Sequence, residues 1–441
     1  MREGNLEPPK RHPLQWQDPA FYDEGALTHE LERVFDVCHG CRRCFNLCNA
    51  FPTLFDLVDE SATGEVDGVN KADFAKVVDQ CYLCDMCFMS KCPYVPPHPL
   101  NIDFPHLMLR AKAVKFKRSG APLRDRILSS TDAVGKLASI PVVVRAVNKV
   151  NSTPATREIL ERVLGVAKER VLPEYASPTF RRQAHPRSDF AVQDGPHAPG
   201  KVAIFSTCYV NYNEPGIGHD LLRILEHNEV PAVLIRKEAC CGMPKLELGD
   251  LESVARLKSA NLPPLLSLAQ EGYAILTAIP SCTLMFKQEL PLMFPDDAEI
   301  AQVAAAMFDP FEYLALRHRD GLLKTDFKQP IGRVSYHVPC HLRVQNMGQR
   351  TREILSLVPG TEVNTVERCS GHDGTWGVKT EYFAESMKIG RPVFKAMAGT
   401  SPDYISSDCP IAARHIQQGI GPESQAEKQH PLRLVRHAYG L

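Results

Sequence analysis

Two cysteine runs decide the fold of the N-terminal part of this chain: Cys38-His-Gly-Cys41-Arg-Arg-Cys44-Phe-Asn-Leu-Cys48 and Cys81-Tyr-Leu-Cys84-Asp-Met-Cys87-Phe-Met-Ser-Lys-Cys92-Pro93. Thiols at i, i+3 and i+6 can bind three irons of one cubane cluster, while the fourth cysteine of such a run binds the other cluster. We therefore expect one [4Fe–4S] cluster on Cys38, Cys41, Cys44 and Cys92, and a second on Cys81, Cys84, Cys87 and Cys48. Tetrahedral zinc is the alternative for Cys-x2-Cys pairs.

Each run follows a segment with helical spacing of its apolar residues. These are Leu27, Leu31, Val34, Phe35 and Cys38 before the first run, and Phe74, Val77, Val78 and Cys81 before the second. Apolar residues three and four apart predict amphipathic helices. The segment between Cys48 and Cys81 is too long for a tight hairpin connection. The pattern therefore favours an α-helical, ferredoxin-like module with two clusters over a small β-rich ferredoxin.

The composition is that of an ordinary globular protein. The chain has 441 residues, 44% hydrophobic and 23% charged, and a net charge of −1, so no overall field favours nucleic acid. No apolar run reaches the roughly 20 residues of a membrane span, and residues 1–10 lack the apolar region of a secretory signal. Its 15 cysteines therefore predict bound metal in a reducing compartment. We expect a cytoplasmic location. Peripheral attachment to the inner face of the membrane is compatible with it.

Residues 110–182 are strongly basic, with 16 lysines and arginines against six acidic residues. Within them, Ile159–Val163 has the spacing of an amphipathic helix. A basic amphipathic segment can lie on an anionic membrane surface and there approach quinone. The alternatives are a solvated helical connector and a basic face that docks an acidic partner.

An internal repeat begins at residue 201. The strand-like segment 201–208 matches 332–340, and the following strand-to-turn segments end at Cys240-Cys241-Gly242 and at Cys369-Ser370-Gly371. A third strand ends at Pro280-Ser281-Cys282 in the first copy and at Ser407-Asp408-Cys409 in the second. Parallel strands bring such turns to one edge of a sheet, where open α/β sheets bind ligands. We expect metal at Cys208, Cys240, Cys241, Cys282, Cys340, Cys369 and Cys409.

The two runs and the duplicated Cys…Cys-Cys-Gly…Pro-Ser-Cys units resemble the cysteine-rich (CCG-domain) iron–sulfur oxidoreductases over about residues 27–441. Members of that family include the B and D subunits of heterodisulfide reductase, the C subunit of anaerobic glycerol-3-phosphate dehydrogenase, and iron–sulfur proteins encoded beside rubrerythrin. The stretches 367–377 and 407–410 are most similar to the glycerol-3-phosphate dehydrogenase protein. The resemblance implies an electron-transfer role beside a separate flavoprotein.

The family unit has five cysteines, and both copies here depart from it. Met285 stands at the last position of the first copy, and Ser370 and Ala412 replace two cysteines of the second. Four thiols remain in the first copy, enough for one further iron–sulfur cluster. The three thiols of the second leave an open iron, a histidine ligand or no metal; the nearby histidines are His337, His341 and His372.

The sequence predicts a multi-domain α+β protein in four parts. These are an N-terminal arm with the ferredoxin-like module (1–110), a basic helical connector (111–200), and two cysteine-rich repeats of an α/β domain (201–330 and 331–441). Since no dinucleotide fingerprint, P-loop or nucleophile elbow is found, we expect no flavin or nicotinamide in this chain. Trp16 and Trp376 are interpreted as packing residues.

The predicted function is that of an iron–sulfur oxidoreductase component. It passes electrons between a partner protein, either a flavoprotein dehydrogenase or a rubrerythrin-like reductase, and an acceptor such as quinone. One alternative is a thiol–disulfide or peroxide-linked reductase that reacts at the second repeat. Another is a zinc-and-cluster scaffold. No catalytic residue is predicted.

Overall fold

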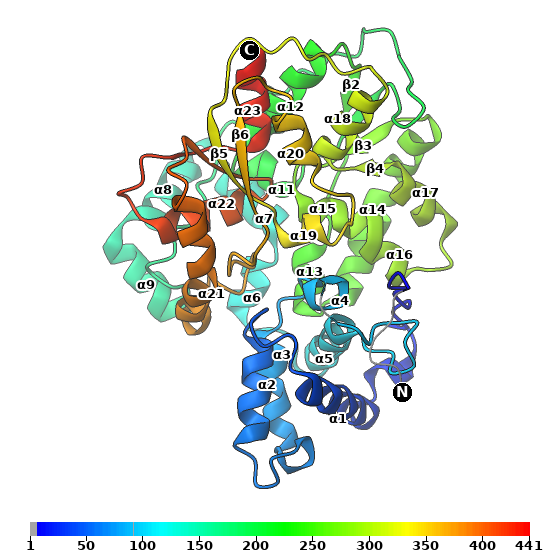
Figure 1. Ribbon diagram of the computed structural model, residues 1–441, viewed down its shortest axis with the longest axis vertical. Coiled ribbons are helices and arrows are strands. Elements are labelled where there is room, and N and C mark those ends of the chain that lie inside the picture. The colour runs from blue at the N-terminus through cyan, green and yellow to red at the C-terminus, as the bar shows by residue number, and fades with distance from the viewer. Residues whose placement is uncertain (1–6, 91) are drawn as a thin grey trace.

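The structure, a computed structural model, describes residues 7–90 and 92–441 and is a mixed α/β protein (Figure 1). A group of N-terminal helices occupies one end of the elongated molecule, and two small parallel sheets with their helices occupy the other. The predicted N-terminal arm lacks regular structure over residues 7–18, and its first six residues lie outside the described part. The arm is followed by a short 3-10 turn, η1 (Pro19–Tyr22).

The helices predicted around the two cysteine runs are confirmed. The two predicted helices are α1 (Glu24–Cys41) and α3 (Phe74–Gln80). The structure adds α2 (Ala50–Asp59), α4 (Met86–Ser90) and α5 (Phe104–Ser119), with 3-10 turns η2 (Val66–Gly68) and η3 (Lys71–Asp73). Asp23 caps α1 by accepting a hydrogen bond from the Ala26 amide at 2.6 Å. The fully buried Phe35 meets Phe74 edge-on, with 5.0 Å between ring centroids. This aromatic contact packs α1 against the segment that leads into the second cysteine run.

Short helices form the connector. They are α6 (Leu123–Leu128), α7 (Thr131–Ala138), α8 (Pro141–Ser152), α9 (Pro154–Leu164) and α10 (Phe180–Gln183). The predicted helix around Ile159 is confirmed as α9, but Ile159 is 59% exposed and Val163 is 74% exposed. The apolar face of α9 therefore points partly to solvent instead of into a core.

Two four-stranded parallel sheets follow, with the orders β2-β1-β3-β4 and β6-β5-β7-β8. The strands of the first are β1 (Val202–Ile204), β2 (Ala232–Leu234), β3 (Ala274–Leu276) and β4 (Met307–Phe308), and those of the second are β5 (Arg333–His337), β6 (Glu362–Val366), β7 (Tyr404–Ser407) and β8 (Glu427–Lys428). The three strands predicted for each unit are confirmed. The edge strands β4 and β8 escaped prediction because two residues carry no recognisable period.

Helices pack around the sheets and join the two units. Those after the first strands are α11 (Cys208–Tyr212), α12 (Pro215–His227), α13 (Met243–Leu248), α14 (Leu251–Gln270), α15 (Pro280–Leu284), the π-helix η4 (Met285–Glu289), α16 (Leu290–Met293), α17 (Ala298–Ala306) and α18 (Pro310–Arg319). The second unit adds α19 (Cys340–Arg343), α20 (Arg350–Leu355), α21 (Thr380–Ala398), α22 (Pro410–Ile420) and α23 (Pro431–Tyr439). Contacts of α23 with α12, and of α19 with α15, hold the units together. One apolar core runs from the N-terminal helices through the first sheet to β5, and a smaller one lies around α21, α22 and β7.

Arg11 of the N-terminal arm is a buried cation that links three parts of the chain. Its guanidinium donates to Asp85 at 2.9 Å and to Asp103 at 2.9 Å, and it lies 3.8 Å from Glu289 of η4. Asp85 belongs to the second cysteine run, and Asp103 caps α5. The ion pairs of Arg11 therefore fix the second cysteine run and α5 against the first sheet unit.

None of the helices in the described part of the chain combines the length and apolar character needed to cross a bilayer.

We predict that Arg11→Met destabilises the protein far more than Arg118→Met does. Loss of the Arg11 guanidinium leaves the buried Asp85 carboxylate without its ion-pair partner, which costs about 3–5 kcal/mol. Arg118, in contrast, pairs with Glu24 at the exposed surface, a contact that contributes about 0–1 kcal/mol. Denaturant unfolding followed by circular dichroism measures both variants. Equal losses would contradict the linking role of Arg11.

Candidate iron–sulfur sites

The first thiol group lies between the end of α1 and the segment after α4. Cys38, Cys41, Cys44 and Cys92 line one small cavity. Arg42 follows α1 in the left-handed conformation (φ 52°), which reverses the chain after Cys41 and returns Cys44 toward Cys38. The spacing predicted this grouping of Cys92 with the first run; ligation of iron by these thiols stays a prediction.

The second thiol group lies beside the first. Cys48, Cys81, Cys84 and Cys87 line another small cavity. Leu83 and Asp85 have positive φ angles of 52° and 60°, so the backbone winds around this space between consecutive cysteines. Such φ values are strained for residues other than glycine and persist where the surroundings enforce them. Here the Arg11 pair holds Asp85 in place.

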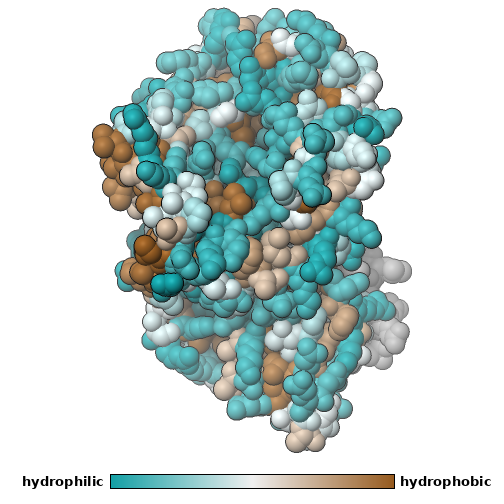
Figure 2. Space-filling model, turned by 90° about the vertical axis from the view of Figure 1, so that its left-hand side faces the viewer, coloured by the Kyte–Doolittle hydropathy of each residue, from teal (hydrophilic) through white to brown (hydrophobic). Residues whose placement is uncertain are grey.

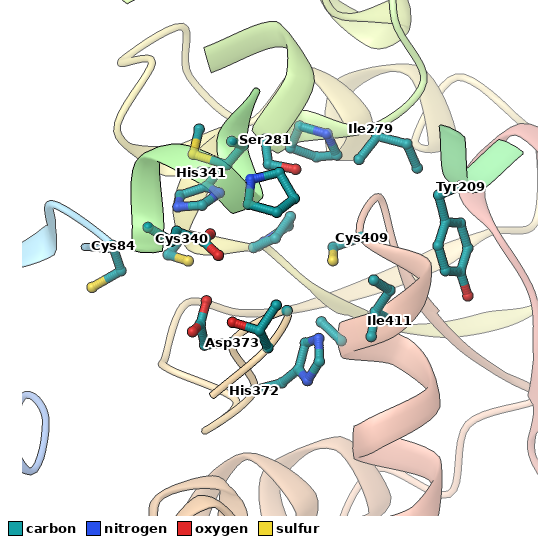
Figure 3. A pocket seen from close by; sticks show the side chains of 18 of the residues that line it. Cys84, Tyr209, Ile279, Ser281, Cys340, His341, His372, Asp373, Cys409 and Ile411 are labelled. Atoms are coloured by element: carbon teal, nitrogen blue, oxygen red, sulfur yellow. The ribbon is translucent and has the colours of Figure 1, made fainter. Parts of the chain in front are cut away.

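The seven remaining cysteines line a single cavity of about 190 Å³ between the two sheets. Figure 3 shows Cys340 and Cys409 on its wall. They follow β1, β2 and β3 of the first sheet and β5, β6 and β7 of the second, at the carboxyl ends of the strands. The predicted position at the carboxyl ends of the strands is therefore observed, but the seven thiols lie at the edges of two separate sheets and not on one edge. That the two edges face one common cavity was not predicted, because sequence periodicity does not orient one unit against the other.

The first unit brings its four thiols into direct contact. Hydrogen bonds from Cys208 and Cys241 lower the pKa of Cys240 well below that of an ordinary thiol. Cys241 also has a side-chain hydrogen bond with Cys282. Thr131 of α7 donates to the Cys240 sulfur at 3.4 Å, and Asp132 accepts from the Cys240 amide. The connector helix thus supports the first thiol cluster, a contribution the sequence did not reveal.

The second unit contributes Cys340, Cys369 and Cys409. Burial, followed by the neighbouring Cys369 and Cys409 thiols, raises the pKa of Cys340 well above its usual value. Cys84 of the N-terminal group also lines this cavity, and burial with the Cys340 and Cys369 thiols raises its pKa. The second N-terminal site therefore borders the shared cavity, as Figure 3 shows for Cys84 and Cys340.

The three histidines near the second unit differ in their hydrogen bonds. His337 uses both ring nitrogens, at 2.9 Å from the Arg368 carbonyl and 3.2 Å from the Ser407 hydroxyl. His372 lines the cavity, and its buried Nδ1 has no hydrogen-bond partner among the described residues. His341 lies beside Cys340 (Figure 3). The arrangement leaves His372, more than His337, available as a further ligand.

The residues that replace family cysteines take different places. Met285 is fully buried at the start of the π-helix η4. Ser370 and Ala412 are buried and line the shared cavity. The second unit therefore keeps space where two thiols of the family unit would lie.

The donor sets fit iron–sulfur clusters. Each N-terminal cavity is lined by four thiols, the number that a [4Fe–4S] cluster takes. Within residues 7–90 and 92–441, no three His, Cys, Asp or Glu side chains are arranged around a single ion; the thiols of a cluster bind separate irons and are spread apart. Burial raises the pKa of Cys38 and Cys87, so cluster binding must displace their protons.

Comparison with known proteins agrees with this arrangement. The sequence pattern of the family described as "Cysteine-rich domain" matches residues 202–287 and 334–416. The chain is also 30% identical over 215 residues to Lactate utilization protein A of Bacillus cytotoxicus, an alignment that covers 47% of this chain and 87% of that protein. The chain belongs to the cysteine-rich (CCG) domain family.

Two further proteins are similar to this chain. The C subunit of the anaerobic glycerol-3-phosphate dehydrogenase of Escherichia coli is 28% identical over 348 residues, which cover 77% of this chain and 83% of that protein. The B subunit of the fumarate reductase (CoM/CoB) of Methanothermobacter marburgensis is 28% identical over 278 residues, 61% of this chain and 53% of that protein. The two matched segments, 202–287 and 334–416, contain β1 to β3 and β5 to β7, and the resemblance inferred from the cysteine pattern is confirmed.

We predict that Cys48→Ala removes the cluster held by Cys81, Cys84 and Cys87, although Cys48 is the last cysteine of the first run. The reason is its position in the second cavity. Cys92→Ala is the matched control and should remove the other cluster. Each variant should lose about four irons per chain, measured by iron analysis, with a different signal lost in electron paramagnetic resonance (EPR) spectra. Loss of the same signal in both variants would contradict the assignment of Cys48 to the second cluster and of Cys92 to the first.

Proposed function

We propose that this protein is an iron–sulfur electron-transfer subunit of a dehydrogenase or reductase complex. The observation that carries the proposal is the adjacency of the thiol groups. The first N-terminal cavity lies beside the second, and Cys84 lines both the second and the shared cavity between the sheets. Such a series of neighbouring sites suits stepwise electron transfer between a partner protein and an acceptor.

In this proposal the thiols of each group hold one cluster, and a bound cluster supplies a site that accepts and releases electrons. Cys38, Cys41, Cys44 and Cys92 hold the first [4Fe–4S] cluster, and Cys48, Cys81, Cys84 and Cys87 hold the second. Cys208, Cys240, Cys241 and Cys282 hold a third, and Cys340, Cys369 and Cys409 hold a further one with a different fourth ligand. Burial of Cys81, Cys87, Cys240, Cys241 and Cys282 keeps water from these sites.

We propose the four predicted parts as the functional divisions of the chain. Residues 1–110 are the ferredoxin-like module, 111–200 the connector, and 201–330 and 331–441 the duplicated cysteine-rich units. The equivalent strand orders of the two sheets support the duplication. The apolar core that joins the N-terminal helices to both cysteine-rich units supports their action together.

The names of the relatives favour this function over a thiol–disulfide or peroxide reductase. Two of them are subunits of an anaerobic glycerol-3-phosphate dehydrogenase and of a fumarate reductase. By analogy, a separate dehydrogenase or reductase protein exchanges electrons with this chain. Quinone at a membrane is the proposed acceptor.

Anaerobically purified protein should show visible absorbance that dithionite bleaches, and its two cysteine-rich units should behave differently. Cys208→Ala should remove the cluster of the first unit. Cys340→Ala should abolish electron transfer to an added acceptor while leaving that cluster intact, because the second unit has three thiols and an incomplete ligand set. EPR spectra and iron content measure both. Unchanged iron and activity in Cys340→Ala would mean that the second unit holds no metal.

An apolar patch on the connector supports membrane contact. We define it by the exposed side chains of Leu137, Ile140, Val142, Ile159 and Val163. They belong to α7, the turn after it, α8 and α9, three helices that pack against one another in sequence order. Figure 2 looks onto the side of the molecule where α8 and α9 lie and shows apolar groups exposed among polar ones. Arg145 and Lys149, also exposed, lie on α8.

The basic charge predicted to drive this contact is partly used within the protein. Lys115, Arg118 and Arg124 pair with Asp79, Glu24 and Glu381. Arg157 and Arg170 are buried and donate to backbone carbonyls. Membrane contact therefore rests on the apolar patch more than on net charge, with residues such as Arg145 attracted to anionic headgroups.

We predict that the double variant Val142→Glu, Val163→Glu loses binding to vesicles that contain anionic phospholipid. Each valine contributes roughly 1.5 kcal/mol when buried, so binding should weaken by more than about tenfold. Val192→Glu, in the 183–200 loop and 50% exposed, is the matched control and should bind as the parent does. Co-sedimentation measures all three. Parent protein that binds an acidic protein but no vesicles would contradict the membrane assignment.

A further inference from the structure

Tyr82 lies at the boundary between the second N-terminal thiol group and the shared cavity. It directly follows Cys81, lines both cavities, and is 4% exposed. Its phenol oxygen lies 2.9 Å from the sulfur of Cys369. Tyr82 therefore joins the second N-terminal thiol group to a cysteine that lies 287 residues further along the chain.

The direction of this hydrogen bond follows from the chemistry of the two groups. A cysteine sulfur that binds iron carries no proton, so the phenol O–H must be the donor. The Gly371 amide donates to the same sulfur at 3.4 Å. Cys369 thus receives two hydrogen bonds.

Packing holds the Tyr82 ring in this position. Its centroid lies 5.4 Å from that of Trp376, and Trp376 stacks on Tyr382 at 4.9 Å with an interplanar angle of 16°. The indole nitrogen of Trp376 donates to the Asp79 carbonyl at 3.0 Å. The loop after Cys369 and the end of α3 are thereby fixed to each other. This contact holds the Tyr82 phenol oxygen next to the Cys369 sulfur.

We propose that Tyr82 is a positioning residue that sets the reduction potential of the cluster bound at Cys369, and so the direction of electron transfer across this boundary. The proposal rests on the proposed function, since it requires a cluster in the second unit. Hydrogen bonds to cluster sulfurs stabilise the more negatively charged, reduced state and raise the potential. With Tyr82 in place, electrons pass more readily from the second N-terminal site to the second cysteine-rich unit.

The test is an EPR-monitored redox titration of the full-length protein with Tyr82→Phe. The midpoint potential of one cluster should shift to more negative values, while the clusters at Cys38 and Cys208 keep theirs. Tyr209→Phe is the matched control, because Tyr209 lines the same cavity but donates to Glu214 at 3.0 Å instead of to a thiol. It should leave every potential unchanged.

A second substitution separates a hydrogen-bond effect from a structural one. Incorporation of 3-fluorotyrosine at position 82 keeps the ring and strengthens the donor, so the same midpoint should shift to more positive values. This measurement also stands if Tyr82→Phe fails to fold. Shifts of the same sign for both changes, or no shift in either, would overturn the role of Tyr82.

Cys369→Ala identifies the signal concerned and tests the underlying function separately. Loss of one EPR signal in Cys369→Ala, with opposite shifts of that signal in the two Tyr82 variants, supports the proposal. If Cys369→Ala retains every signal, the second unit binds no cluster, and the proposed function fails at that site. If the signal is lost but the Tyr82 variants titrate as the parent does, the inference about Tyr82 alone fails.

Discussion

The structure depends on one constraint: the carboxyl ends of two parallel sheets face each other across a common cavity. In a parallel sheet every strand delivers its following turn to the same edge, so cysteines placed after the strands gather there. The contact of α19 with α15 then brings the two edges together. Seven thiols that lie up to about 200 residues apart in sequence become neighbours. The two sheets share this cavity although no strand of one sheet pairs with a strand of the other.

Buried polar contacts attach the N-terminal helices to the rest of the molecule. Arg11 joins Asp85 and Asp103 to Glu289, and burial makes each of these charges dependent on the others. Lys112 of α5 donates to the Cys81 carbonyl. These contacts hold the second cysteine run at the mouth of the shared cavity, where Cys84 and Tyr82 enter it. Purely apolar contacts would allow the N-terminal helices to slide over the sheet units, whereas paired charges fix one orientation of these helices.

The two cysteine-rich units differ in the contacts that surround their cysteines. In the first unit Cys240 is surrounded by Cys208, Cys241 and Thr131, a dense set of sulfur and hydroxyl contacts. In the second unit Ser370 and Ala412 leave room, and the buried Nδ1 of His372 has no partner among the described residues. A complete ligand set favours a stable electron relay, while an incomplete one exposes an iron to other ligands. Under the proposed function, the two units would therefore take different tasks.

The sequence by itself determined the local features. The spacing of Leu27, Leu31, Val34 and Phe35 predicts α1, the cysteine runs predict how eight thiols divide into two groups, and the repeat predicts the strands that precede Cys208 and Cys340. The helix and the strands depend on neighbours within a few turns of chain, which periodicity records, and the thiol groups follow from the fixed spacing of the cysteine runs. Only the tertiary structure decided that Cys84 and Tyr82 border Cys369, that Ile159 and Val163 are exposed, and that basic connector residues pair within the chain. Those contacts join residues far apart in sequence, and their formation depends on how whole elements pack, which no local pattern specifies.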